Sequence, residues 1–217
     1  MVKTLIAIPC MDMLPVGFFT SMMNLRKPEG TSYAPFSNCL IYDSRNTFVV
    51  NAIEGGFDRI LWLDSDMVFE PDLLERLSAD MDSGLEFVSA LAFKRRIPTG
   101  PTIYKELVYD RRDDGTLKVK AEPYKDYPKD ELFEIAGSGF GAVMTSTDLL
   151  KRVWDTYGPP FDPMTQIGED LACCWRVKQI GCKMYCDSRV KVGHIGTYIF
   201  CEDTYLHQIA SANTANE

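Results

Sequence analysis

The sequence predicts an α/β protein with a mainly parallel sheet that is flanked by helices and carries a hairpin insert. Two observations predict the sheet: apolar runs alternate with amphipathic segments along residues 1–93, and the run Ile60–Leu63 stops abruptly at two carboxylates. A third predicts the insert: residues 98–131 are rich in Pro, Tyr and charge, and they interrupt the alternation. With 217 residues, 46% hydrophobic and 25% charged, the chain is expected to form one domain over residues 1–217.

The elements before the insert follow from apolar periodicity and capping residues. Asp43 or Ser44 can cap a helix that ends at Gly55-Gly56, and Pro71 suits the first turn of another. Residues 11–42 lack a clear pattern and are expected to be rich in loops. The predicted strands are 1–10, 60–63 and 87–93, and the predicted helices are 43–54 and 71–82. This succession implies parallel strands with right-handed crossovers.

The elements after residue 97 follow from turn signals. Asp114-Gly115 lies between the β-like runs Ile103–Tyr109 and Thr116–Ala121, which predicts a hairpin outside the central sheet. Cap and stop residues predict two helices, and short apolar runs predict the remaining strands. The predicted helices are 147–157 and 169–180, and the predicted strands are 133–136, 142–145 and short segments near 184 and 190.

Bulk composition narrows the function and the compartment. The net charge of −8 argues against nucleic-acid phosphates as the main partner, although Lys94-Arg95-Arg96 forms a local basic patch. The seven cysteines show no paired spacing, so we expect reduced thiols in a cytoplasmic protein. The first apolar run is too short for a signal peptide, and no segment reaches membrane-spanning length, so we expect a soluble protein without a membrane span.

Asp64 and Asp66 are the first candidate site residues. Side chains alternate along a strand, so two residues separated by Ser65 point the same way if the extended backbone continues past Leu63. Two adjacent carboxylates repel each other, and a cation relieves the repulsion. Mn²⁺ and Mg²⁺ prefer oxygen ligands and commonly share them with substrate phosphates. The pattern predicts a metal–diphosphate site at a strand end, and an ordinary turn or helix cap is the alternative interpretation.

Three further motifs have both a structural and a functional interpretation. Alternate glycines in Gly137–Gly141 let a ligand approach the backbone, or they form a bulge. Glu169-Asp170 opens a helix, where acids either complement the dipole or supply a general base; consecutive helical residues point about 100° apart, so one of the two would face a substrate. His194, close to Gly193 and Gly196, is a metal ligand or a structural histidine.

In their order and spacing, these motifs resemble the nucleotide-sugar-dependent glycosyltransferases of the GT-A fold, in particular family-2-like members. The segment Gly168–Arg176, followed by Gly181, Asp187 and Gly193-His194, is similar to the C-terminal signature of that group. The resemblance covers residues 2–200 apart from the insert. It implies a GT-A (Rossmann-like) fold and a metal-dependent transfer, with inversion, of a sugar from a nucleotide-sugar donor to a hydroxyl of a glycan, protein or small-molecule acceptor.

The resemblance also implies a role for each matching residue. Asp64, Asp66 and His194 would hold Mn²⁺ or Mg²⁺. Asp170 would be the catalytic base, with Glu169 as the other catalytic acid of the pair. Independently of the resemblance, the turn, the tyrosines and the position of the 98–131 insert predict a flap on the acceptor side, and a solvated insert with no role is the alternative. The implied donor-binding residues are Pro9, Arg45, Asp64, Ser65, Asp66, Gly137, Ser138 and Gly139. The acidic residue that holds the nucleotide base in family-2 enzymes has no clear counterpart within residues 11–42.

Other functions fit parts of the pattern. A nucleotidyltransferase would share the α/β core and the metal acids, but it is expected to carry a Gly-rich basic loop after the first strand, which Pro9–Met13 is not. A non-catalytic nucleotide- or sugar-binding module would keep the fold, and the intact acids with His194 argue against it. Modification of nucleic acid is opposed by the net charge of −8.

Overall fold

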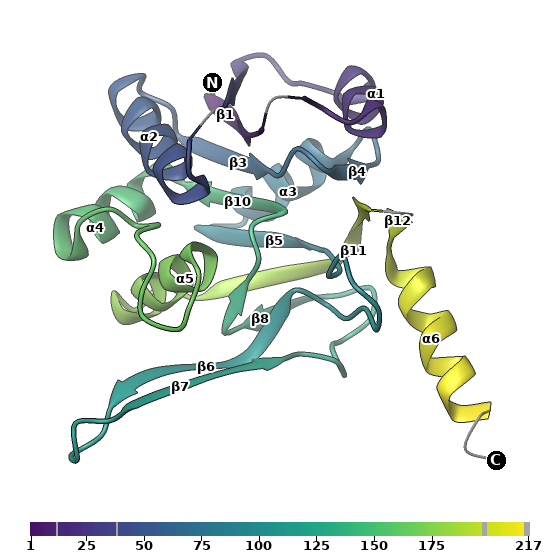
Figure 1. Cartoon of the computed structure of the whole chain (residues 1–217). Helices are drawn as coiled ribbons and strands as arrows, with labels where there is room; N and C mark the ends of the chain where they lie inside the picture. The colour runs from purple at the N-terminus through teal and green to yellow at the C-terminus, as the bar shows by residue number, and fades with distance from the viewer. Residues whose placement is uncertain (12, 38, 197–198, 215–217) are drawn as a thin grey trace.

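The computed structural model describes residues 1–11, 13–37, 39–196 and 199–214, and a central sheet organises them (Figure 1). The strand order is β2-β1-β3-β10-β5-β11, with β12 beyond β11. Within this path β10 is antiparallel to both β3 and β5, whereas the pairs β1–β2, β1–β3 and β5–β11 are parallel. The strands are β1 (Thr4–Pro9), β2 (Thr31–Phe36), β3 (Arg59–Leu63), β5 (Phe87–Leu91), β10 (Ala142–Ser146), β11 (Met184–Ile195) and β12 (Ile199–Phe200). The predicted mainly parallel sheet is confirmed.

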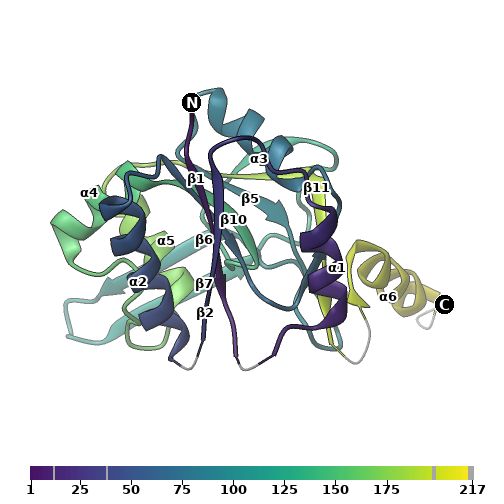
Figure 2. The same ribbon diagram turned by 90° about the horizontal axis from the view of Figure 1, so that it is seen from above.

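Helices cover both faces of the sheet (Figure 2). One face carries α2 (Ile41–Glu54), α4 (Thr147–Tyr157) and α5 (Glu169–Gln179), and the other carries α1 (Val16–Asn24) and α3 (Leu73–Asp82). Because helices cover both faces, the strand Ile60–Leu63 is fully buried, and this explains why its sequence is a continuous apolar run. Trp62 anchors the first face, and its indole N–H donates to Thr145 Oγ1 at 3.0 Å.

Strand β11 also belongs to a second, smaller set of antiparallel pairs. Its last residues pair with β12 and with β4 (Met67–Phe69), a three-residue strand that follows Asp66 immediately. In this register Met67 lies opposite His194, and the Ile195 N–H donates to the Asp66 carbonyl at 2.7 Å. Strand pairing therefore brings Asp66 beside His194, although the two are distant in the sequence.

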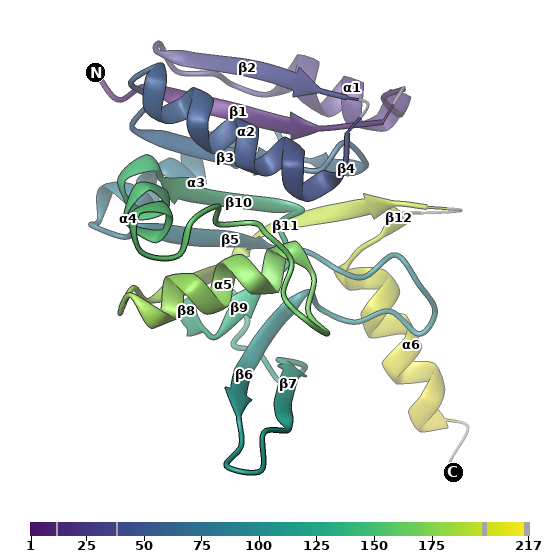
Figure 3. The same ribbon diagram turned by 60° about the vertical axis from the view of Figure 1, so that its left-hand side comes forward.

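The insert forms a hairpin outside the central sheet, as predicted (Figure 3). Strands β6 (Ile103–Arg111) and β7 (Leu117–Pro123) are antiparallel, and β6 also pairs with β9 (Gly137–Ser138) to make a separate three-stranded sheet. Gly115 has φ of +81°, the left-handed conformation expected in the hairpin turn. Strand β8 (Leu132–Ile135) joins the edge of the central sheet by pairing with β11.

Several local predictions were wrong or incomplete. The stretch 11–42 holds α1 and β2, and neither β4 nor α6 (Glu202–Thr214) was predicted. Helix α2 begins at Ile41 with no side-chain cap, so the capping role predicted for Asp43 or Ser44 is wrong: both residues lie inside its first turn. Helix α3 begins at Leu73, two residues after Pro71.

Two expectations about the chain as a whole can be compared with the structure. All seven cysteines are free thiols, as their spacing predicted. Within the described ranges no helix combines the length and the apolar character that crossing a membrane requires.

Helix α4 offers a test of capping. Ser146 precedes the helix in an extended conformation, and its hydroxyl accepts the Leu149 N–H at 3.1 Å. Ser146→Ala leaves that donor without its partner and is expected to lower the free energy of unfolding by about 1 kcal/mol, measured by urea denaturation. Ser146→Thr should retain most of the stability because threonine also caps. Equal stability of the Ala variant and the native protein would contradict the cap.

Candidate active site

A cleft of about 350 Å³ opens where β1 and β3 end. Strands of an α/β sheet place their carboxyl ends at one edge, which is where such folds bind ligands. The predicted residues Pro9, Ser65 and Glu169 reach this cleft from three separate elements. Its full lining is Pro9, Cys10, Met11, Cys39, Ile41, Ser44, Arg45, Asp64, Ser65, Asp66, Arg95, Glu169 and His194.

Arg45 is the buried cation of the cleft, with only 3% of its side chain exposed. It projects from α2 and binds Asp64 Oδ1 at 2.7 Å and Glu169 Oε1 at 3.2 Å. Its guanidinium also lies over the rings of Phe140 and Phe161, 5.2 and 5.7 Å from their centroids. Burial opposes its charge, but the carboxylates of Asp64 and Glu169 hold the pKa of Arg45 above its ordinary value. Arg45 therefore links the end of β3 to the start of α5.

Asp66 and His194 form a second close pair in the cleft. His194 Nε2 lies 3.1 Å from Asp66 Oδ2, and Arg95 Nη1 donates to the same oxygen at 2.6 Å. Burial opposes ionisation, but the hydrogen bond to His194 lowers the pKa of Asp66, and the same contact raises the pKa of His194. The other ring nitrogen of His194, Nδ1, lies 3.0 Å from the Phe93 carbonyl, to which its N–H donates.

His194 and Asp66 provide two of the ligand atoms that a divalent cation requires. With Nδ1–H bound to a carbonyl, Nε2 is the nitrogen left for a ligand, and metal-binding histidines are commonly held in this way. Asp66 adds a carboxylate oxygen beside it. Asp64, the third predicted ligand, is instead turned toward Arg45, and burial raises its pKa despite that partner. Among the described residues no group of three His, Cys, Asp or Glu side chains forms a complete metal site.

Glu169 and Asp170 face different surroundings at the start of α5. Glu169 lines the cleft and contacts Arg45, whereas Asp170 is not among the described residues that line it. A Cβ atom placed on Gly139 would lie 3.6 Å from Asp170 Oδ2. Burial, reinforced by the charge of Glu169, raises the pKa of Asp170 to about 6, well above that of an ordinary aspartate. A base with a pKa near 6 is ionised at neutral pH and accepts protons better than an ordinary aspartate.

In the glycine-rich segment Gly137–Gly141, some residues serve packing and others lie beside candidate site residues. Gly137 and Ser138 are buried in β9; a Cβ atom on Gly137 would lie 3.3 Å from the Cys174 side chain, so the glycine lets β9 pack against α5. Neither is among the described residues that line the cleft, and their donor-binding role stays a prediction. Gly139 lies beside Asp170, and the Gly141 carbonyl accepts the Asp64 N–H at 3.1 Å.

Some residues of the cleft were not predicted as site residues. Ser44 Oγ and Arg45 Nε are buried and have no hydrogen-bond partner among the described residues, which marks them as groups that a ligand can satisfy. Ser44 was predicted only as a helix cap and was therefore not considered as a site residue. Arg95 carried a signal, because it lies in the basic run that follows β5, and Cys10 directly follows the end of β1.

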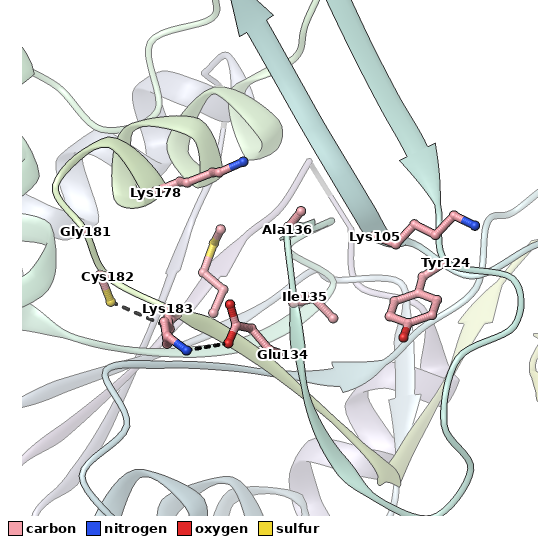
Figure 4. A pocket seen from close by; sticks show the side chains of 10 residues that line it. Lys105, Tyr124, Glu134, Ile135, Ala136, Lys178, Gly181, Cys182 and Lys183 are labelled. Carbon is pink, nitrogen blue, oxygen red and sulfur yellow. Dashed lines mark hydrogen bonds and ion pairs between the residues drawn. The ribbon is translucent and has the colours of Figure 1, made fainter.

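A larger cavity, of about 490 Å³, lies at the other end of α5 (Figure 4). It is bounded by the hairpin, β8 and the start of β11, and none of the predicted site residues lines it. Two of its lysines already have protein partners: Lys183 binds Glu134 at 2.8 Å, and Lys178 donates to the Leu107 carbonyl at 3.3 Å. Size alone does not identify an active site, and the smaller cleft, which holds several of the predicted residues, remains the candidate.

Comparison with solved structures relates this fold to a known architecture. A197 from STIV matches 90% of this chain and 86% of its own, with a TM-score of 0.63 and 19% sequence identity. GalNAc-T7, solved with UDP, GalNAc and Mn²⁺, matches 94% of this chain with a TM-score of 0.59 and 12% identity. The fold is GT-A-like. This chain spans only 47% of the GalNAc-T7 chain. No protein-family model and no curated protein matches the sequence.

Proposed function

We propose that this chain is a metal-dependent glycosyltransferase that moves a sugar from a nucleotide-sugar donor to an acceptor hydroxyl with inversion. The observation that carries the proposal is the division of acids at the start of α5. Glu169 joins Arg45 and Asp64 in the cleft, whereas Asp170, with its raised pKa, faces Gly139 outside it. This gives one side for a donor and another for a base that acts on an acceptor.

The donor side has the groups that a nucleoside diphosphate requires. Arg45 and Arg95 supply positive charge, and Ser44 Oγ supplies an unused hydroxyl. Asp66 and His194, with Asp64 nearby, would hold Mn²⁺ or Mg²⁺. The bound cation would supply positive charge against the charge that develops on the leaving diphosphate. The GalNAc-T7 structure, which holds UDP and Mn²⁺ in the same fold, supports this assignment.

In the proposed reaction Asp170 accepts the proton of the acceptor hydroxyl. The acceptor hydroxyl oxygen attacks the anomeric carbon of the donor, and its proton passes to the Asp170 carboxylate. The bond between the anomeric carbon and the diphosphate oxygen breaks, and the nucleoside diphosphate leaves with that electron pair. Arg45 takes no proton in this step; it holds the side chains of Asp64 and Glu169 in place.

Calorimetric titration with UDP and GDP tests the donor side. We expect nucleotide binding to tighten at least tenfold when Mn²⁺ is present, because the diphosphate and the two protein ligands share the cation. Asp66→Ala and His194→Ala should each abolish that gain, since each removes a ligand of the cation. His207→Ala is the matched control, because His207 is exposed on α6 and is not among the described residues that line the cleft. Equal binding with Mn²⁺ and with a chelator would refute the metal assignment. Binding without any transfer to a broad acceptor panel would favour a non-catalytic module.

A further inference from the structure

Large apolar side chains are exposed around the mouth of the cleft. They follow the carboxyl ends of β1, β2, β5 and β11, which all run in one direction and therefore end at one edge of the sheet. Figure 1 shows α1 and β12 at this edge. We call these residues the apolar rim: Met11, Met13, Leu14, Val16, Phe19, Met23, Leu40, Ile41, Ile97 and Ile199.

Helix α1 is apolar on two sides, and only one of them is covered. Phe18 is buried and packs edge-on against Phe69, with ring centroids 6.1 Å apart. Val16, Phe19 and Met23 recur at helical spacing on another side, where they are 79%, 55% and 67% exposed. A helix that is apolar all round is normally buried, so these three residues, the α1 stripe, are expected to have a partner.

Basic residues accompany the apolar rim, and acids are missing from its two main segments. Residues 13–28 and 94–100 contain no Asp or Glu, in a chain of net charge −8. Lys27 lies just beyond α1 and donates to two backbone carbonyls, at 3.0 and 3.1 Å. Arg96 precedes Ile97, whose side chain is 68% exposed. Within the described ranges neither Lys27 nor Arg96 forms an ion pair with a carboxylate.

Contacts across β11 join α1 to the basic loop 94–100. A Cβ atom on Gly17 would lie 3.1 Å from Ile195 Cδ1, and the Ile195 carbonyl accepts from Arg95 Nη1 at 3.5 Å. Pro15 and Arg95 also line one hollow of about 450 Å³, which shares Asp66 and Arg95 with the candidate cleft. The α1 stripe, the basic loop and the mouth of the cleft therefore belong to one side of the molecule.

We infer that the apolar rim docks on the surface of an anionic membrane, with the α1 stripe and Ile97 among the lipid headgroups and Lys27 and Arg96 against lipid phosphates. Side chains that protrude singly can enter a fluid headgroup layer, which is how amphipathic helices bind at membrane interfaces. The local positive charge selects the anionic bilayer, and the acidic remainder of the chain is repelled by it, so the charge fixes which side makes contact. The inference concerns where the protein binds and does not depend on the proposed function.

Vesicle flotation of the full chain tests the inference. The probes are large unilamellar vesicles of phosphatidylcholine alone and of an equimolar mixture of phosphatidylcholine and phosphatidylglycerol. We expect the native protein to bind the mixed vesicles about tenfold more tightly, because each cation close to an anionic surface adds to the attraction. Raising the salt from about 0.05 M to about 0.5 M should reduce this preference, since salt screens charges.

An apolar variant and a matched control locate the docking surface. Val16→Ser/Phe19→Ser/Met23→Ser removes the α1 stripe and should weaken binding to the mixed vesicles by about tenfold or more. Val2→Ser/Tyr157→Ser removes two exposed apolar side chains outside the apolar rim and should bind like the native protein.

Two further variants separate charge from apolar contact. Lys27→Gln/Arg96→Gln keeps the α1 stripe and should bind the two kinds of vesicle about equally. Phe19→Trp keeps an apolar ring at the contact, so mixed vesicles with bromine-labelled lipid chains should quench its fluorescence more than that of the native protein.

Three outcomes would overturn the inference. The native protein binds neither kind of vesicle, the triple serine variant binds the mixed vesicles as tightly as the native protein, or Phe19→Trp shows no additional quenching. Sedimentation velocity without vesicles adds a fourth: a dimer of the native protein that the triple serine variant abolishes would assign the α1 stripe to a second copy of the chain.

Discussion

Asp170→Asn is expected to lower the turnover of sugar transfer by about 10²- to 10⁴-fold while nucleotide binding changes little. Asparagine keeps the shape and can still accept the Leu171 N–H, which Asp170 Oδ1 now accepts at 2.7 Å, but it cannot take the acceptor's proton. Steady-state kinetics gives kcat, and calorimetry with UDP or GDP gives the donor affinity. Asp148→Asn, at an exposed acid in the first turn of α4, is the matched control. Near-native turnover in the Asp170 variant would remove Asp170 as the base and make Glu169 the next residue to test.

The raised pKa of Asp170 adds two pH-dependent signatures to this variant. In the native protein kcat/KM should rise with pH through about 6, the value at which the carboxyl ionises, and the variant should lose that limb. The pKa of Asp170 in the folded protein, about 6, lies above its ordinary value of 3.8, so ionisation of Asp170 lowers the stability of the fold as the pH rises from about 4 to above 6. The variant should therefore have a higher free energy of unfolding than the native protein at pH 7.5, by at most about 3 kcal/mol as measured by urea denaturation. Below pH 4 the two proteins should be equally stable.

Arg45→Met is expected to lower the free energy of unfolding by about 3–5 kcal/mol at pH 7.5. Methionine fills similar volume over Phe140 and Phe161, but it leaves Asp64 and Glu169 as partly buried carboxylates that repel each other. Protonation relieves that repulsion, so the loss should be smaller at pH 5, which urea denaturation at the two pH values measures.

A compensating variant separates charge from packing at this position. Arg45→Met combined with Glu169→Gln keeps the new side chain and removes one of the two acids, so it should regain part of the stability at pH 7.5. If the double variant is no more stable than the single one, or if the single variant loses equal stability at both pH values, lost packing rather than charge explains the effect.

The sequence predicted the parts of the fold that have strong periodicity or turn chemistry. The run Ile60–Leu63 is buried on both faces, and Asp114-Gly115 stands in a turn that only a few residue types fit, so β3 and the hairpin were identified. Strand β2 was not predicted because it is an edge strand that contains Pro35 and exposes Tyr33. Helix α1 was not predicted because its apolar residues do not all face inward.

Several predicted site residues line one cleft, and Asp66 and His194 were predicted to share a cation, but the carboxylate partners of Arg45 were not predicted. Asp66 and His194 meet through the register of β4 with β11, and a three-residue strand is too short to leave a pattern in the sequence. Arg45 was predicted to bind the donor, yet its two ion-pair partners, Asp64 and Glu169, are protein carboxylates. Which acid a buried arginine binds depends on tertiary contacts, and neither composition nor spacing encodes them.

The pairing of Arg45 with Glu169 joins residues that are 124 positions apart, and this separation has a consequence for how the protein acquires its chemistry. Contacts between distant residues require the intervening chain to be ordered first, since closing a long loop costs entropy before the contact repays it. A ribosome that has synthesised β1 to β5 has already produced Arg45, Asp64 and Asp66, but not yet the start of α5 or His194. Until those later segments dock, Arg45 has Asp64 but lacks Glu169, and Asp66 lacks His194, at an open sheet edge. Competence to bind nucleotide should therefore arise abruptly, at the last stage of folding, rather than grow in proportion to the structure already formed.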